Sequence, residues 1–77
     1  MKTTDRLREN TAYEIVSFKG AQDIIDRLID IGFHPGQKLV YQNQASFHGP
    51  KIFRLHNMSV ALRDEELKTL ELREVSL

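Results

Sequence analysis

The sequence predicts a mainly β fold, a small five-stranded barrel with one α-helix inserted after the first strand. Three observations support this prediction. Five short segments are rich in β-branched and aromatic residues and are separated mostly by turn residues. One further segment, between the first two of these, has the period of an amphipathic helix. With 77 residues, the chain is too short for two sheets of useful size, and closing one sheet into a barrel removes exposed strand edges.

The first strand and the helix are separated by a glycine. Residues 13–18 combine aromatic and β-branched side chains and end at Lys19-Gly20, which predicts a strand with a breaker after it. From about residue 21 to 31 the isoleucines and Leu28 share one side of a helix, opposite a stripe of aspartates. This apolar arc is wide, so we expect most of it to plug one side or end of the barrel, with Leu28 at its centre.

The segment after the helix predicts a sharp reversal of the chain. Gly32 follows the last apolar position and can adopt a left-handed conformation without steric cost. Phe33 would then stand where a Schellman motif packs it back near Leu28. Pro35-Gly36 supplies the two central residues of a type II turn.

Four further strands complete the predicted barrel. They are residues 38–45, 51–56, 58–63 and 70–75. A Gly-Pro step marks residues 46–50 as a loop, Asn57 suits a tight turn, and residues 64–68 form a single polar turn. We expect residues 1–11 to be a loosely ordered lead-in and residues 12–77 to form one domain.

The composition restricts the compartment. The chain contains no cysteine, which excludes disulfides and thiolate metal sites and is compatible with a reducing compartment. Residues 1–6 lack the apolar run of a signal peptide, and nowhere do about 18 apolar residues run together as a membrane span requires. We therefore expect a cytoplasmic protein that is neither exported nor embedded in a membrane.

The charges are balanced in number and uneven in position. Eleven basic and eleven acidic side chains give a formal net charge of zero. No Asp or Glu occurs from Ile31 through Leu62, whereas Lys38, Lys51, Arg54 and all three histidines fall there. Three cations are too few for the roughly six to ten phosphate contacts of a DNA-binding protein, so we expect no nucleic-acid partner. The charge-poor surface around the middle strands instead favours a protein partner.

Ordered motifs make the sequence resemble a known family. Arg27-Leu28, Ile31-Gly32-Phe33 and Pro35-Gly36 resemble the helix-to-turn signature of the ferrous iron transport protein A (FeoA) family. Ala45 and Pro50 are placed like the two ends of the Ala-Pro-Leu-Gly-Asp-Pro loop of that family. The first part of the chain is therefore similar to FeoA proteins in both order and spacing.

The later part of the chain extends the resemblance. Residues 60–63 followed by Leu67 resemble the Ala-Leu-Arg strand and turn of the FeoA family. The match runs from about Leu7 to Val75, nearly the whole chain. Each of these short motifs is common when it occurs alone, whereas three blocks of motifs in this order and at this spacing are uncommon.

The departures from the family lie in a loop and at one turn. Ser46, His48 and Gly49 stand where the family usually has Pro, Gly and Asp. The glycine that usually precedes the first strand is absent from Asn10-Thr11-Ala12.

The resemblance implies an SH3-like barrel and a cytoplasmic accessory role in ferrous iron uptake, with no catalysis and no cofactor. The implied partner is the large membrane transporter that carries its own GTP-binding domain, and the chain would be peripheral to the membrane only through this partner. An alternative is a small-barrel module acting with a metal-dependent transcriptional regulator, since similar SH3-like modules resemble the C-terminal part of iron-responsive repressors. The sequence leaves self-association open.

The residues themselves predict neither a catalytic nor a metal site. The chain lacks a glycine-rich phosphate loop and a supported Ser-His-Asp arrangement. His34, His48 and His56 are ligand types that suit Fe(II), but they have no helical pairing and no neighbouring acid, so surface or packing roles are favoured. The aspartate stripe of the helix could hold a hard cation, and a solvated helix face is the simpler interpretation.

The partner-binding candidates are Phe47, His48, Phe33 and His34. Phe47 is an aromatic residue in a polar loop, so it either folds back over the barrel end or contacts a partner, and His48 adjoins it. Phe33 either packs against the helix or takes part in recognition, and His34 follows it in the turn.

Overall fold

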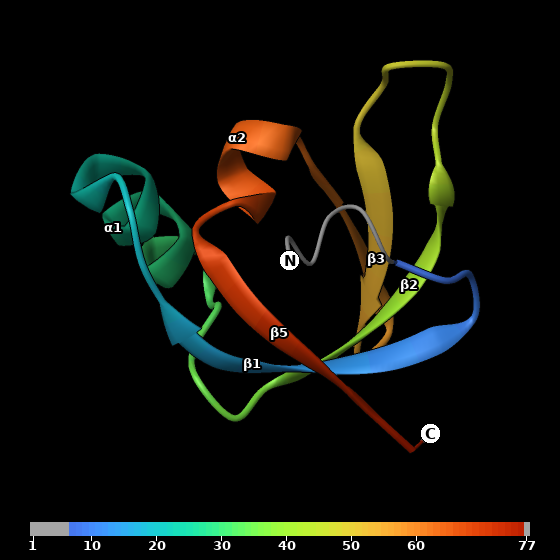
Figure 1. Ribbon diagram of the computed structural model, residues 1–77, viewed down its shortest axis with the longest axis horizontal. Coiled ribbons are helices and arrows are strands. Elements are labelled where there is room, and N and C mark those ends of the chain that lie inside the picture. Colours follow the sequence, from blue (N-terminus) through green and yellow to red (C-terminus); the bar gives the residue numbers. More distant parts are fainter. Residues whose placement is uncertain (1–6, 77) are drawn as a thin grey trace.

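Five strands form one bent antiparallel sheet that is accompanied by two helices. The computed structural model describes residues 7–76. The elements are β1 (Thr11–Phe18), α1 (Gln22–Ile31), β2 (Lys38–Gln44), β3 (Lys51–Leu55), β4 (Met58–Leu62), α2 (Asp64–Leu67) and β5 (Leu70–Val75). The strand order is β4-β3-β2-β1-β5. Figure 1 shows β3 standing at a steep angle to β1 and β5, so the sheet wraps around an interior. The predicted mainly β fold with five strands and one inserted helix is confirmed.

Two β-bulges bend this sheet. The register between β1 and β5 shifts between Ile15 and Ser17, and the register between β2 and β3 shifts between Tyr41 and Asn43. A bulge adds a residue to one strand and increases its bend and twist. The bulges therefore help five short strands to curve around one core.

The core fills the inside of the bent sheet. Its buried side chains are Tyr13, Ile15, Leu28, Phe33, Leu39, Tyr41, Phe53, Leu55, Leu62, Leu67 and Leu70. Every strand and both helices contribute at least one of them. The rings of Tyr41 and Phe53 pack at a tilt with their centroids 5.3 Å apart. One contiguous core therefore ties the helices to the sheet.

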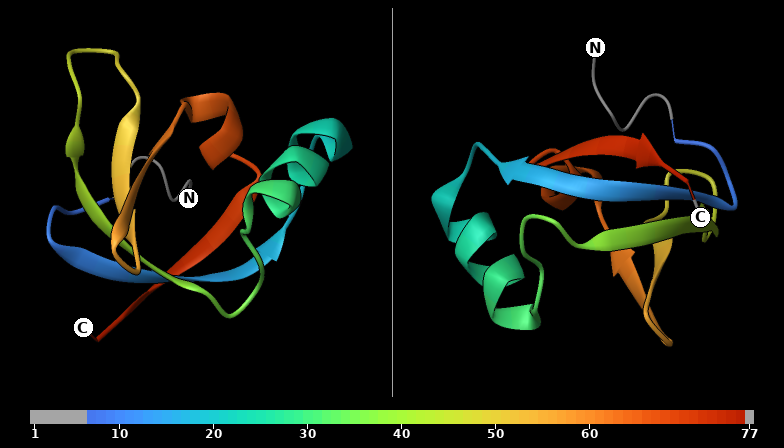
Figure 2. Two further views of the ribbon diagram at one scale, coloured as in Figure 1. Left: turned by 180° about the vertical axis from the view of Figure 1, so that it is seen from behind. Right: turned by 90° about the horizontal axis from the view of Figure 1, so that it is seen from below.

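Helix α1 covers the core with only part of its apolar arc. Leu28 is fully buried and Ile25 nearly so, which confirms Leu28 as the centre of the contact. Ile29 and Ile31 remain 48% and 55% exposed, so the arc is wider than the surface it covers. Figure 2 shows the reason, because α1 lies on one side of the molecule, away from the β3–β4 hairpin.

The end of α1 has the predicted Schellman geometry. The Phe33 N–H donates to the Leu28 carbonyl at 3.0 Å, and the Gly32 N–H donates to the Ile29 carbonyl at 3.0 Å. These are the two hydrogen bonds of that motif. Gly32 has a φ of 124°, a conformation that favours glycine.

A type II turn then leads the chain into β2. Gly36 has a φ of 89°, and the Gln37 N–H donates to the His34 carbonyl at 3.2 Å. Both features match the predicted turn. The Gly36 N–H donates to the Ile15 carbonyl at 2.7 Å, and the Ile15 N–H donates to the Gln37 carbonyl at 2.9 Å. The turn is therefore fastened to β1.

The segment before β1 contacts the barrel. Leu7 packs against the core, and the Arg8 guanidinium reaches both carboxylate oxygens of Glu74 at 2.5 and 2.6 Å. Asn10 has a φ of 60° and so takes the left-handed turn where the family usually has glycine, a conformation that asparagine tolerates. The rest of the expected lead-in, residues 1–6, lies outside the described residues.

Candidate partner-binding site

The β2–β3 loop is held in a defined shape by its own backbone. The Ala45 N–H donates to the Pro50 carbonyl at 2.9 Å, and the Gly49 N–H donates to the Ser46 carbonyl at 2.8 Å. His48 has a φ of 64°, a left-handed conformation that histidine adopts more often than most residues. Glycine, which the FeoA pattern usually has at the position of His48, adopts this conformation without steric cost.

Gly49 allows a close approach within the loop. A Cβ at Gly49 would lie 2.5 Å from the Ser46 Oγ and 3.0 Å from the Ser46 nitrogen. With Ser46 in this rotamer, a side chain at position 49 would require the Ser46 hydroxyl to turn away and the Ser46 backbone to give by a few tenths of an ångström. The Gln44 Nε2 also donates to the Gly49 carbonyl at 3.0 Å, which ties the loop to the end of β2.

Phe47 projects from this loop into solvent. Its side chain is 89% exposed, so it does not fold back over the barrel end. Its ring meets the His48 imidazole edge-on, with centroids 4.1 Å apart and an interplanar angle of 63°. Single exposed apolar residues are common on protein surfaces, but aromatic residues are enriched in binding hot spots. The loop therefore offers an aromatic pair to a partner.

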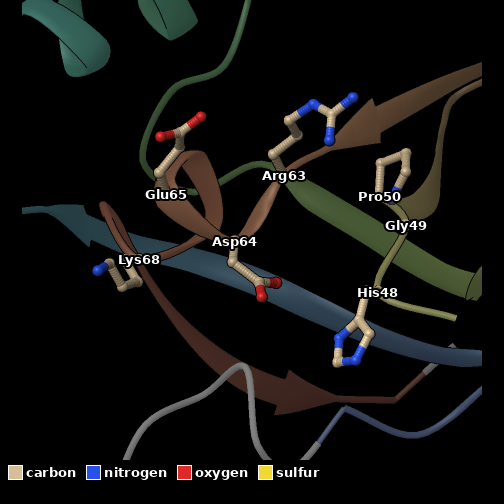
Figure 3. Close-up of a pocket in the computed structure, with 7 residues that line it drawn as sticks. All are labelled: His48, Gly49, Pro50, Arg63, Asp64, Glu65 and Lys68. Atoms are coloured by element: carbon tan, nitrogen blue, oxygen red, sulfur yellow. The ribbon is translucent and has the colours of Figure 1, made fainter.

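An open pocket of about 350 Å³ involves the same loop (Figure 3). It is lined by His48, Gly49, Pro50, Arg63, Asp64, Glu65 and Lys68. The β3–β4 register pairs Lys51 with Leu62, which brings the loop before β3 beside the start of α2. In Figure 3 the Asp64 side chain points toward the side on which His48 lies, and Lys68 points away.

Helix α2 positions the charged wall of this pocket. The Arg63 N–H donates to the Glu66 carboxylate at 2.9 Å, one of the two bonds of a capping box. Leu67 is fully buried and anchors the short helix in the core. The Lys51 ammonium lies 3.1 Å from the Asp64 carboxylate. The wall carries both signs of charge, as the polar rim of a protein interface does.

Phe33 and His34 do not belong to this site. Phe33 is 1% exposed, so the expectation that it contacts a partner is wrong, because the Schellman turn directs its ring into the core. His34 is exposed, its Nδ1 donates to the Pro35 carbonyl at 3.0 Å, and it lines a different pocket. Figure 1 shows the turn before β2 and the β2–β3 loop at opposite ends of β2. The structure therefore brings Phe47 and His48 together and separates them from His34.

Sequence reasoning missed the charged residues beside His48. Arg63 and Lys68 lie 15 and 20 positions further along the chain, and no local pattern links them to the loop. The predicted hairpin could have revealed Arg63, because pairing residues 51–56 with residues 58–63 places Pro50 next to Arg63.

The shifted pKa values arise from packing and surface charges away from this loop. Burial raises the pKa of Tyr41. A hydrogen bond from Ser17, and then the charge of Lys19, lower the pKa of Glu71. Among residues 7–76, no three side chains of His, Asp or Glu come together in a way that could hold a metal ion. Neither α1 nor α2 is long and apolar enough to cross a membrane.

Similarity to known proteins decides the family. The FeoA domain family matches residues 3–74 of the chain. This chain belongs to the FeoA family. The resemblance seen in the motifs is thereby confirmed, and the FeoA family is one associated with ferrous iron transport. No curated protein sequence matches the chain.

Solved structures of FeoA proteins share the fold. FeoA of Stenotrophomonas maltophilia, solved with zinc and described as a prokaryotic SH3 domain protein, is 25% identical with a TM-score of 0.74, covering 95% of this chain and 89% of that one. Iron(II) transport protein A of Clostridium thermocellum is 24% identical with a TM-score of 0.83, covering 97% of this chain and 46% of that one. This chain therefore spans just under half the length of the Clostridium thermocellum protein. FeoA of Chlorobium tepidum is 22% identical with a TM-score of 0.81, covering 99% of this chain and 71% of that one. The SH3-like fold is confirmed.

Proposed function

We propose that this chain is a non-enzymatic cytoplasmic accessory protein of ferrous iron uptake that binds and modulates the membrane ferrous iron transporter through the transporter's cytoplasmic GTP-binding domain. The observation that carries the proposal is the β2–β3 loop, which presents an 89% exposed Phe47 next to His48 and its pocket. Family membership supports iron uptake as the process. The loop supports binding as the activity.

The proposed contact has the anatomy of a protein interface. An exposed aromatic side chain supplies the anchor, and a pocket lined by charges of both signs supplies the polar rim. The backbone hydrogen bonds of the loop order the backbone that carries Phe47 before binding, which lowers the backbone entropy lost on association.

Any nucleotide chemistry in the proposed complex belongs to the transporter. The sequence contains no glycine-rich phosphate loop of the kind that binds GTP. The role left to this chain is to bind the GTP-binding domain and so alter its activity.

Calorimetric titration of the chain into the purified GTP-binding domain of the transporter from the same organism tests the proposal. The titration is run without nucleotide, with GDP and with a non-hydrolysable GTP analogue. We expect the wild-type chain to bind in at least one of these states. Phe47→Ser should weaken binding about 30-fold, because losing a hot-spot side chain costs about 2 kcal/mol.

Met58→Ser is the matched control. Met58 is likewise an exposed large apolar residue, at 50%, and it lies at the start of β4, at the opposite end of the β3 strand from the loop. Met58→Ser should bind the GTP-binding domain as the wild type does. Circular dichroism checks that both variants fold. No association of the wild type at about 50 μM in any nucleotide state would overturn the proposal, since that concentration saturates a micromolar complex. An equal loss of affinity in Phe47→Ser and Met58→Ser would show that the contact is not made by the β2–β3 loop.

A further inference from the structure

The sheet has two outer edges, and they differ in their side chains. The strand order β4-β3-β2-β1-β5 leaves one long side of β4 and one long side of β5 without a neighbouring strand. An unpaired strand edge presents backbone N–H and C=O groups that can pair with another chain, and proteins usually protect such an edge with charged side chains or a covering segment. The protection of the two edges therefore decides where a further strand can be added.

The β5 edge is protected by charge. Three of the six residues of β5 are charged, namely Glu71, Arg73 and Glu74. The segment before β1 also reaches this strand, because the Arg8 guanidinium forms an ion pair with Glu74 at 2.5 Å. The charges and the Arg8 contact make the β5 edge a poor site for adding a strand.

The β4 edge lacks this protection in the part of the chain that the structure describes. β4 contains no charged residue, proline or glycine. Apart from its ladder with β3, it makes no backbone hydrogen bond within residues 7–76. Ser59 and Ala61 are exposed, and Met58 is 50% exposed. The β3–β4 hairpin also projects beyond the other strands in the right-hand view of Figure 2. An uncharged, exposed edge of this kind favours pairing with a strand of another chain.

The hairpin register determines which backbone groups point to the β4 edge. A two-residue turn joins β3 to β4, and its closing pair is Leu55 and Met58. The closing pair of such a hairpin is hydrogen-bonded, and hydrogen-bonded pairs then alternate with non-hydrogen-bonded pairs along the two strands. Met58 and every second residue after it therefore bond to β3. The N–H and C=O groups of Ser59 and Ala61, which lie between them, point to the free edge.

We propose that this chain self-associates by antiparallel pairing of β4 with β4 of a second copy, about a two-fold axis at Val60. In this register, Ser59 of each copy lies opposite Ala61 of the other copy. Each of these two pairs forms two hydrogen bonds, because the N–H and C=O groups of both residues point to the edge. All outward N–H and C=O groups of β4 are then satisfied in both copies.

The side chains of β4 fit the same register. Met58, Val60 and Leu62 share the inner face of the strand, because side chains alternate between the two faces and Leu62 is buried. Pairing places Met58 of each copy opposite Leu62 of the other, so the exposed Met58 side chain gains apolar neighbours. On the outer face, the small uncharged side chains of Ser59 and Ala61 lie opposite each other. Within the paired strands no like charges meet.

A second copy suits this edge better than a strand of another protein, because the β4 edge is complementary to itself. A two-fold axis brings the same surface of both chains together. This contact covers both unprotected edges at once and leaves only the charged β5 edges at the two ends of the combined sheet. A single added strand would instead present a new edge of its own. Pairing through β4 therefore also stops at the dimer.

Sedimentation velocity and amide hydrogen exchange of the full chain test the proposal. The concentration runs from about 20 μM to about 1 mM, which detects dissociation constants up to the millimolar range. We expect monomers to convert to dimers with no larger species. Exchange followed by NMR should slow at the amides of Ser59 and Ala61 as the dimer forms, and change less at Val60, which already bonds to β3.

Two results of these measurements would overturn the proposal. The first is a chain that remains monomeric at about 1 mM. The second is slow exchange of the Ser59 and Ala61 amides in the monomer, because the chain would then cover its own β4 edge.

Ala61→Pro removes an outward N–H and no hydrogen bond to β3, and edge strands tolerate proline at such a position. The dimer loses one hydrogen bond from each copy, so its dissociation constant should rise about 30-fold. Unchanged dimerisation of a folded Ala61→Pro variant would contradict the pairing.

Two double substitutions test the register and do not depend on the proline variant. Ser59→Glu with Ala61→Glu sets like charges opposite each other and should abolish the dimer, whereas Ser59→Glu with Ala61→Lys sets opposite charges and should retain it. Equal dimerisation of the two double variants overturns the proposal.

Phe47→Ser is the control for association through the most exposed aromatic ring. This variant should dimerise as the wild type does. Loss of the dimer in Phe47→Ser with dimerisation retained in Ala61→Pro would overturn the proposal. None of these outcomes depends on whether the β2–β3 loop binds the transporter.

Discussion

Phe33 and Phe47 are the same residue type in opposite environments, and truncating each to alanine tests both assignments. Phe33 is 1% exposed and Phe47 is 89% exposed. Removing a buried phenylalanine side chain costs about 3–5 kcal/mol through lost burial and the cavity left behind. A 77-residue domain has a free energy of unfolding of about 4–12 kcal/mol at the usual value per residue. Phe33→Ala should therefore remove between a quarter and all of the stability.

Thermal and urea unfolding, followed by circular dichroism, measure the two effects. At about 4–8 °C for each kcal/mol, Phe33→Ala should lower the Tm by about 12–40 °C. Phe33→Leu should cost less and keeps the comparison usable if the alanine variant does not fold. Phe47→Ala should change the free energy of unfolding by less than about 0.5 kcal/mol, as exposed positions do.

Two results would refute this reasoning. A wild-type Tm for Phe33→Ala would mean that the ring does not fill the core. A larger loss for Phe47→Ala than for Phe33→Leu would mean that the β2–β3 loop is packed against the barrel in solution, and the partner-binding role of Phe47 would lose its basis.

Two further predictions concern the turn after α1 and the edge of the sheet. Gly32→Ala should lower the free energy of unfolding by about 1–3 kcal/mol, as measured in urea, because Gly32 has a φ of 124° that strains other residues. No neighbouring atom lies within 4 Å of an added Cβ, so a steric clash does not contribute. An unchanged urea midpoint would contradict this prediction. Ser17→Ala should raise the pKa of Glu71 toward its ordinary value of 4.5, because it removes the hydrogen bond that lowers this pKa. A lowered pKa gives stability that is present above the ordinary value and lost as the pH falls through the folded-state pKa, so Ser17→Ala should lose less stability on acidification. NMR titration of the Glu71 carboxyl, with unfolding measured at neutral and acid pH, checks both effects, and an unshifted titration would contradict them.

The order of the elements could be predicted because each element carries its own signal. The predicted helix over about residues 21–31 agrees with α1, and the predicted strand over residues 70–75 agrees with β5. The first strand begins two residues earlier than residue 13, where aromatic and β-branched residues start. Thr11 and Ala12 have no strong strand pattern, and they are extended because they pair with β2, and Ala12 also with β5. Pairing with neighbouring strands therefore extends β1 beyond the segment that local propensity predicts.

The candidate sites show where such prediction stops. Phe47 stood out because it is an aromatic residue in a polar loop, and the structure leaves it exposed. Phe33 lies in an equally short turn, and the Schellman hydrogen bonds turn it inward. The sequence was compatible with either burial or exposure of each of these two side chains, because exposure depends on what packs against the turn.

By itself, the sequence determined the type and order of the elements, the positions of the turns and membership of the FeoA family. These properties depend on local periodicity, on residues such as Gly32 that permit a positive φ, and on motif spacing. Only the tertiary structure decided which side chains meet. Arg63 reaches the β2–β3 loop, and Arg54 and His56 reach the turn of Gln37, because strands distant in the sequence pair in a bent sheet. The grouping of charges at each pocket is therefore a product of tertiary packing, which no local sequence pattern records.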